Sequence, residues 1–391
     1  MAAPAREAPG RGRETSGARR TTWLWPGGRS YFLLVCGLVA LGLIFVFSSS
    51  YPLAGRPTMT GTNNPYYYFW LQVRYASVGL IMMLLVSLLP VKRIAWLAWP
   101  GFIAGALGMI AAVIIGKKVG GAYCWLPLGS FRFQPSEFAK VAYLVLMAIT
   151  FARGPMPRAS IGRIWVPALA LTGVMALILA AQRDVGMAML VCSLALGMAL
   201  LGGMRLRYWV PLATGSALLG LLVARATPHA WVRFEDWLHP EDHLQGGGAH
   251  VYSMLVALAR GGPLGLGLGM SPDKWTTLPV PHTDSIFCVV GGELGLWGGI
   301  GVILLMTLLA VWAFRVARAC PHRLGFFIAA GAGLSLALQA FINIAVATAL
   351  LPVTGLTLPF MSAGGSSLMA SLLCAGLVLA VAAESRPREE A

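Results

Sequence analysis

Charged residues are scarce in this chain, and acidic residues are the scarcest. Only 11% of the 391 residues are charged, with 14 acids against 29 basic residues. Hydrophobic residues make up 58% of the chain, and its mean hydropathy is +0.74. This composition excludes a single soluble globule, because one core cannot hide so much apolar surface. The sequence therefore predicts an integral membrane protein.

Paired cysteines are also missing. The six cysteines stand singly, mostly inside apolar runs, and form neither a CxxC motif nor a spacing typical of metal sites. This pattern excludes a disulfide framework and a zinc site of the usual kind. We interpret the cysteines as small apolar core residues.

Apolar runs of about 18 residues or more, long enough to cross about 30 Å of hydrocarbon, recur along the chain instead. We expect an all-α protein with ten transmembrane helices, near residues 31–49, 68–89, 94–115, 137–152, 164–181, 185–202, 208–224, 285–313, 324–350 and 364–383. Residues 31–383 then form one membrane domain. Residues 1–30 are expected to be a disordered basic tail, and residues 384–391 a short tail.

The formal net charge of +15 is explained by membrane topology and not by nucleic-acid binding. The basic residues fall in short clusters between apolar runs, and most lie on the side of the two termini. This asymmetry predicts that both termini are cytoplasmic. Most of the acids fall at or near the opposite, outer face, where we expect any chemistry to occur.

One outer segment, residues 225–284, is far longer than the few residues needed to join the seventh and eighth helices. Loops of this length are usually functional. The stretch VYSMLVALARGG within it predicts an interfacial helix.

Asp284 stands in VPHTDSIF, at the end of this loop and directly before a long apolar run. One interpretation is structural: Asp284 or Thr283 caps a helix that begins at Ser285, by accepting free backbone N–H groups. The other is catalytic: a carboxylate shielded from bulk water at the membrane boundary is suited to act as a general base. The two interpretations are compatible, since a cap would hold the side chain in place.

Glu137 and Lys140 stand three residues apart in QPSEFAK, so they share one face of the fourth span. Ser136 is a candidate cap at the start of that helix. A local ion pair is the simpler interpretation of the two charges. Charges inside a span usually face a cavity or a partner, however, which favours a role for Lys140 in holding a phosphate or pairing with Asp284.

Residues 350–369, LLPVTGLTLPFMSAGGSSLM, interrupt the last two spans with prolines and glycines. Irregular backbone at this depth is tolerated only where protein or a watery cavity satisfies its polar groups. Gly364-Gly365-Ser366-Ser367 leads into the last helix, whose N-terminus offers N–H groups to an anion such as a phosphate. Ser366 and Ser367 are therefore candidate binding residues.

In order along the chain, these motifs resemble those of the SEDS family, the FtsW, RodA and SpoVE proteins of bacterial cell-wall synthesis. The matching stretches are SSS at 48–50, QPSEFAK at 134–140, QRDVGMA at 182–188, GGPLGLGLG at 261–269, LPVPHTDSIFCVVGGELGLWG at 278–298, QAFINIAV at 339–346 and LLPVTGLTLPFMSAGGSS at 350–367. The resemblance covers essentially everything after the N-terminal tail and slightly favours the FtsW type.

The resemblance implies a multi-pass protein of the bacterial cytoplasmic (inner) membrane, with ten helices and both ends in the cytoplasm. It implies a peptidoglycan glycosyltransferase acting in cell division or shape maintenance. Such enzymes polymerise lipid II, an undecaprenyl-pyrophosphate-linked disaccharide-pentapeptide, at the outer membrane face. The implied partners are lipid II, a class B penicillin-binding protein that is a transpeptidase, and divisome or elongasome proteins.

The same resemblance assigns roles to individual residues. Asp284 occupies the position of the family's essential aspartate, and Trp125 matches an important tryptophan of an outer segment. Glu137 and Lys140 match a pair near that aspartate. Two arginines that the family carries before the tryptophan are missing here, so we expect their phosphate contact to be absent or supplied by another cation such as Arg132.

We expect an inverting glycosyl transfer in which Asp284 deprotonates the C4 hydroxyl of the acceptor sugar. Lys140 and Arg132 would stabilise the departing undecaprenyl pyrophosphate. His282 and Thr283 flank the base in its motif and are expected to support it. We expect no cofactor and no metal ligands, although the sequence leaves open a divalent cation at the pyrophosphate.

Two other functions remain open from the sequence. Broken helices and intramembrane charges would suit a lipid II flippase or transporter. A non-catalytic scaffold that activates a penicillin-binding protein would suit the missing arginines. The acids gather at the outer boundary and not at the midplane, which favours the enzyme over the carrier.

Overall fold

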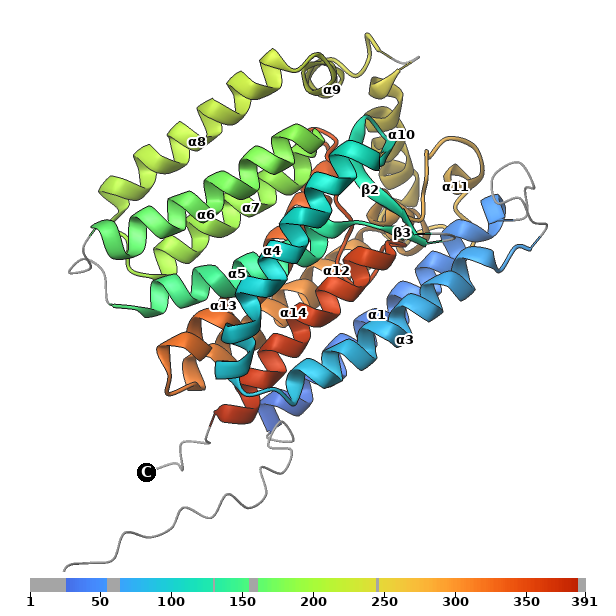
Figure 1. The fold of residues 1–391 in the computed structure, drawn as a ribbon. Helices are drawn as coiled ribbons and strands as arrows, with labels where there is room; N and C mark the ends of the chain where they lie inside the picture. The colour runs from blue at the N-terminus through green and yellow to red at the C-terminus, as the bar shows by residue number, and fades with distance from the viewer. Residues whose placement is uncertain (1–25, 55–63, 129–130, 155–160, 244–245, 386–391) are drawn as a thin grey trace, which may run out of the picture.

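Long helices packed side by side dominate the fold (Figure 1). The structure, a computed structural model, describes residues 26–54, 64–128, 131–154, 161–243 and 246–385, so most of the two expected tails lies outside it. Ten helices match the ten predicted spans: α1 (Pro26–Ala54), α3 (Tyr67–Ser87), α4 (Val91–Ile115), α5 (Pro135–Ala152), α6 (Ile161–Gln182), α7 (Val185–Leu201), α8 (Leu206–Ala226), α12 (Ile286–Ala319), α13 (Arg323–Ala347) and α14 (Gly365–Glu384).

Within the described ranges, nine of these helices are long and apolar enough to cross a membrane, and α7 is a shorter apolar helix of 17 residues. The prediction of an all-α membrane protein is confirmed. Several helix ends differ from the predicted spans, most clearly at α1, which begins at Pro26 inside the expected tail. Hydropathy detects only the apolar centre of a helix, whose polar end turns can continue beyond it.

Helices α5, α13 and α14 form the centre of the bundle, and most of their residues are buried. Small residues allow neighbouring helices to approach closely. A side chain at Gly376 of α14 would meet the backbone of Met83 in α3, and one at Gly105 of α4 would meet Ala139 in α5. Glycine and alanine at such contacts are typical of helix packing in membranes.

Helix α8 lies at the periphery and has no buried residue among those whose burial is described. Leu218 is 61% exposed and Leu222 is 64% exposed. Apolar side chains this exposed on a spanning helix are expected to face lipid.

The elements outside the bundle gather at one of its ends, while α1 starts and α14 finishes at the other (Figure 1). The long loop at residues 225–284, predicted to be extracytoplasmic and called the outer loop below, contains α9 (Pro228–Leu238), α10 (Gly247–Gly261) and α11 (Asp273–Thr276). Helix α10 confirms the helix expected there. A short antiparallel sheet, which the sequence did not predict, joins α4 to α5 with strands β1 (Lys117–Val119), β2 (Ala122–Leu128) and β3 (Phe131–Phe133) in that order.

Candidate functional site

Asp284 lies in the segment that enters α12, and its side chain is half-buried. Its Oδ1 accepts a hydrogen bond from the Thr283 hydroxyl at 2.9 Å. Its backbone oxygen accepts from Asn343 Nδ2 of α13 at 3.0 Å. The expected cap is wrong: Ser285 is the N-cap residue of α12, and no side chain caps that helix. Helix α12 begins one residue later than the cap interpretation required, so the Asp284 carboxylate is not engaged by its N–H groups.

His282 is buried beside the ring of Tyr68 from α3, with 4.4 Å between the ring centroids. Its backbone oxygen accepts from Ala363 N at 2.7 Å, so the segment also contacts the irregular stretch before α14. Burial lowers the pKa of His282 to about 4, although the nearby Asp284 opposes this shift. His282 is therefore neutral at physiological pH and contributes packing and not charge.

His250 of α10 is a neighbour of Asp284 that the sequence analysis missed. Its Nε2 lies 3.1 Å from the Ser285 hydroxyl. Burial lowers the pKa of His250, and the charge of Asp284 opposes this shift. No local signal could have revealed the contact, because His250 and Ser285 are 35 positions apart and meet only through the fold of the outer loop.

Glu137 and Lys140 form a buried ion pair on α5, as the simpler interpretation held. Lys140 Nζ lies 2.6 Å from Glu137 Oε2, and the side chains are 2% and 3% exposed. Lys140 also donates to Gln339 Oε1 of α13 at 2.7 Å. These contacts hold Lys140 inside the bundle, so the structure does not show the expected pairing with Asp284. Gln134 and not Ser136 is the N-cap residue of α5, and no side chain caps that helix.

Gln339 and Asn343 of α13 connect the buried ion pair on α5 with the segment that carries Asp284. Gln339 accepts from Lys140, and Asn343 donates to the backbone of Asp284. Residues four positions apart share one helix face, so α13 presents both amides to the same side. Two amides at this spacing in the apolar run QAFINIAV were the signal that could have identified them.

Ser366 and Ser367 lie in the first turn of α14, as predicted, but both hydroxyls are engaged within the protein. Ser366 Oγ accepts from Gln134 N at 3.0 Å. Ser367 Oγ accepts from Gln339 Nε2 at 3.1 Å and from Thr357 Oγ1 at 2.6 Å. In this structure they join α14 to α5 and α13 and are not presented to a ligand.

Trp125 and Arg132 lie on the small sheet. Trp125 of β2 pairs with Lys117 of β1, and Arg132 of β3 pairs with Pro127. Trp125 is half-buried, and Arg132 is exposed. The Arg132 guanidinium is within electrostatic range of the Tyr68 hydroxyl, whose ring packs on His282. The sheet thus places Arg132, the expected substitute cation, on the side of the bundle that carries Asp284.

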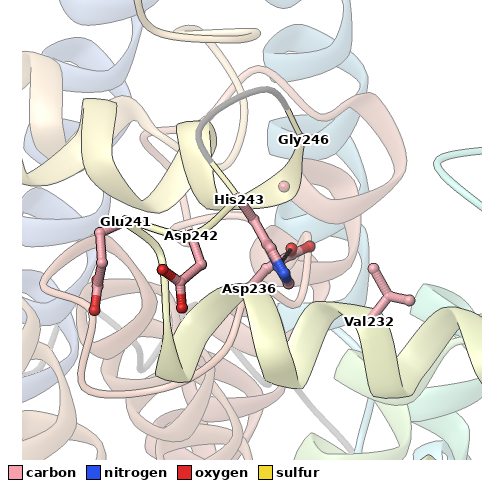
Figure 2. A pocket seen from close by; sticks show the side chains of 7 residues that line it. Val232, Asp236, Glu241, Asp242, His243 and Gly246 are labelled. Carbon is pink, nitrogen blue, oxygen red and sulfur yellow. Dashed lines mark hydrogen bonds and ion pairs between the residues drawn. The ribbon is translucent and has the colours of Figure 1, made fainter.

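A separate pocket of about 540 Å³ lies between α9 and α10 in the outer loop (Figure 2). Asp236, Glu241 and Asp242 line it, and the side chains of Asp236 and His243 point toward one another. Asp236 Oδ1 is 2.7 Å from His243 Nδ1. An acidic lining of this kind repels a pyrophosphate, so this pocket is a poor site for the expected substrate.

In the part of the chain that the structure describes, no group of three or more His, Cys, Asp or Glu side chains is arranged to hold a metal ion. The cysteines of the described part are free thiols. A cation held by the pyrophosphate itself stays an expectation from the sequence.

Comparison with known proteins gives one consistent result. A family model described as "Cell cycle protein", FtsW/RodA/SpoVE, matches residues 29–387. The chain is 38% identical to the probable peptidoglycan glycosyltransferase FtsW of Halorhodospira halophila, over 88% of each chain. It is 32% identical to the stage V sporulation protein E of Bacillus subtilis, over 89% of this chain and 95% of that one.

A solved structure has the same fold with a TM-score of 0.72, at 29% identity over 90% of this chain and 97% of that one. It is described as showing structural coordination of polymerization and crosslinking by a peptidoglycan synthase complex.

Proposed function

Because the chain belongs to the FtsW, RodA and SpoVE family of cell cycle proteins, we propose that it polymerises lipid II with Asp284 as the general base. The names of its relatives support a peptidoglycan glycosyltransferase, and the FtsW relatives favour a role in cell division. The observation that supports Asp284 as the base is the environment of its carboxylate. It is half-buried at the outer end of the bundle, and its side-chain partner is a neutral hydroxyl.

In the proposed step, the Asp284 carboxylate accepts the proton of the C4 hydroxyl of the acceptor N-acetylglucosamine. The oxygen then bonds to the anomeric carbon of the growing chain's N-acetylmuramic acid. The bond from that carbon to the pyrophosphate breaks with inversion, and undecaprenyl pyrophosphate leaves. General base catalysis contributes about 10²- to 10⁴-fold to such a reaction, and alignment of two membrane-bound substrates contributes much of the rest.

Arg132 is the best candidate to stabilise the leaving pyrophosphate. It is exposed on β3, and an exposed guanidinium can form two parallel hydrogen bonds to phosphate oxygens. Lys140 is a poorer candidate than the sequence implied, because Glu137 and Gln339 already occupy its ammonium group. We assign Lys140, Glu137, Ser366 and Ser367 to holding α5, α13 and α14 together beneath the site.

Trp125, His282 and Thr283 complete the proposed site. Trp125 lies on the strand next to Arg132 and offers an aromatic face to a sugar. His282 packs on Tyr68 and is neutral, while Thr283 donates to the Asp284 carboxylate and orients it. The solved synthase complex supports a partner that crosslinks the new glycan, for which we propose a class B penicillin-binding protein of the divisome.

The test uses the purified full-length chain with its penicillin-binding protein and fluorescent lipid II. Asp284→Asn keeps the size of the side chain and removes its basicity, so we expect glycan polymers to disappear while folding and complex formation persist. Glu241→Gln removes an exposed acid of the same outer loop and should leave the glycan ladder unchanged. Normal ladders from Asp284→Asn would overturn the assignment and favour transport or scaffolding instead.

A further inference from the structure

Lys274 and Glu293 form a second buried ion pair, and Asp284 lies between them in the sequence. Lys274 belongs to α11, and Glu293 lies in the first part of α12. Lys274 Nζ is 2.7 Å from Glu293 Oε1, with the side chains 3% and 0% exposed. The pair therefore closes the segment that carries Asp284 into a loop whose two ends are fixed to each other.

Ser48 of α1 completes this cluster. Its hydroxyl donates to Glu293 Oε1 at 2.6 Å and accepts from Lys274 Nζ at 3.0 Å. We call Ser48, which is half-buried, and the buried Lys274 and Glu293 the triad. It joins the outer loop to two spanning helices, α1 and α12, and gives a role to the first serine of the SSS motif and to the glutamate of GGELG.

The backbone of the outer loop also bonds to α12, at residues on either side of Glu293 and at Glu293 itself. Gly295 interrupts that helix with a φ of 69°, which leaves nearby backbone groups without helical partners. The loop supplies partners through three hydrogen bonds, Leu266 N to Gly292 O at 3.1 Å, Gly267 N to Glu293 O at 2.9 Å and Leu296 N to Gly262 O at 2.8 Å. The glycine-rich stretch 261–269 thus docks into a break in a transmembrane helix.

The two charged side chains of the triad are buried and are therefore closed to a substrate. Lys274 is buried and already donates to Ser48 and Glu293. Asp284, by contrast, is held by a hydroxyl at its side chain and by one amide at its backbone. The position of its carboxylate thus depends on how firmly the ends of its segment are fixed.

We propose that Ser48, Lys274 and Glu293 are positioning residues that fix the segment carrying Asp284 in the reactive geometry. This inference rests on the proposal that Asp284 is the base. A misplacement of about 1 Å at a reacting group can lower a rate by about 10²-fold without weakening substrate binding. The triad therefore acts on kcat and not on KM.

The test is Lys274→Met combined with Glu293→Gln in the full-length chain with its penicillin-binding protein, assayed with fluorescent lipid II. The double variant leaves no unpaired charge in the interior, so we expect a thermal unfolding midpoint close to that of the wild type. We expect kcat to fall by about 10²-fold and KM to stay within about twofold. A wild-type midpoint together with a wild-type kcat would overturn the proposal.

The matched control neutralises another ion pair of the same loop. Arg260 NH1 lies 2.8 Å from Asp273 Oδ1, and this pair joins α10 to α11 with no side-chain hydrogen bond to the described residues of α1 or α12. Arg260→Gln combined with Asp273→Asn should keep kcat within about twofold. An equal loss of kcat in this control would mean that any damage to the loop slows the reaction, and it would overturn the specific role of the triad.

Two further variants make the result unambiguous. Ser48→Ala keeps the ion pair and removes its link to α1, so it decides the matter should the double variant fail to fold. We expect about a tenfold loss of kcat, and a wild-type kcat would overturn the proposal. Asp284→Asn is assayed in parallel. If it is inactive while the triad variants keep wild-type kcat, the positioning role of the triad is rejected and the role of Asp284 as base stands. If Asp284→Asn is active, the role of Asp284 as base is rejected.

Discussion

Asp284 and Glu137 are both acids near the end of the bundle that we predict to be the outer one, yet their surroundings are opposite. Glu137 is buried, and its charge is neutralised by Lys140 at 2.6 Å. Asp284 is half-buried, and its side-chain partner is the Thr283 hydroxyl. A neutralised acid in the interior holds helices together, whereas an acid without a counter-charge at the edge can exchange a proton with a substrate. Within one small region, Glu137 therefore serves stability, whereas Asp284 is suited to chemistry.

Removing the counter-charge of Glu137, which is Lys140, should destabilise the fold. Lys140→Met leaves the Glu137 carboxylate buried and unpaired, which we expect to lower the free energy of unfolding by about 3–5 kcal/mol. The double variant Lys140→Met/Glu137→Gln should recover most of that loss, because no charge then remains in the interior. Thermal unfolding of the purified protein measures both effects. Equal stability of the single variant and the wild type would contradict the structural role.

Arg132→Gln should slow polymerisation without changing stability. A hydrogen bond to a charged group contributes about 1.5–3 kcal/mol, so its loss should slow polymerisation by about 10- to 100-fold. The unfolding midpoint should not change, because Arg132 is exposed. Arg205→Gln removes an exposed arginine at the start of α8 and serves as the control. Equal rates for Arg132→Gln and Arg205→Gln would exclude Arg132 from pyrophosphate binding.

At neutral pH His282 should give the smallest effect of the three, because it is uncharged there, and its effect should grow as the pH falls. Its pKa falls from 6.5 to about 4 on folding, so between these values the unfolded chain binds more protons than the folded one. Stability should therefore decrease as the pH falls from about 6.5 to about 4. His282→Phe keeps a ring against Tyr68 and should make this decrease shallower. An unchanged dependence of the unfolding midpoint on pH would show that other groups cause it.

Much of the membrane architecture could be predicted because hydropathy acts locally. Each span is visible in its own stretch of sequence, and the ten predicted spans have ten counterparts in the structure. The pair Glu137 and Lys140 was equally visible, since helix geometry places residues three apart on one face. The short sheet escaped prediction because two of its three strands have only three residues each, too few to show an alternating pattern.

The candidate site could be predicted only in part. The motif around Asp284 was recognisable in the sequence, but its neighbours His250 and Asn343 come from distant segments. The expected contact between Lys140 and Asp284 failed for the same reason. Lys140 finds its second partner, Gln339, on another helix, and no pattern within α5 reveals it.

Local composition and motifs alone indicated that this chain enters a membrane, roughly where its helices lie, and which motif carries the acid that we propose as the base. These properties follow from local composition, because a lipid interior forces every spanning backbone segment to satisfy its own hydrogen bonds. Which charges on different elements neutralise each other depends on the tertiary structure, as for Lys274 of α11 and Glu293 of α12. Ion pairing needs a few ångströms of proximity, and between different elements only packing provides it.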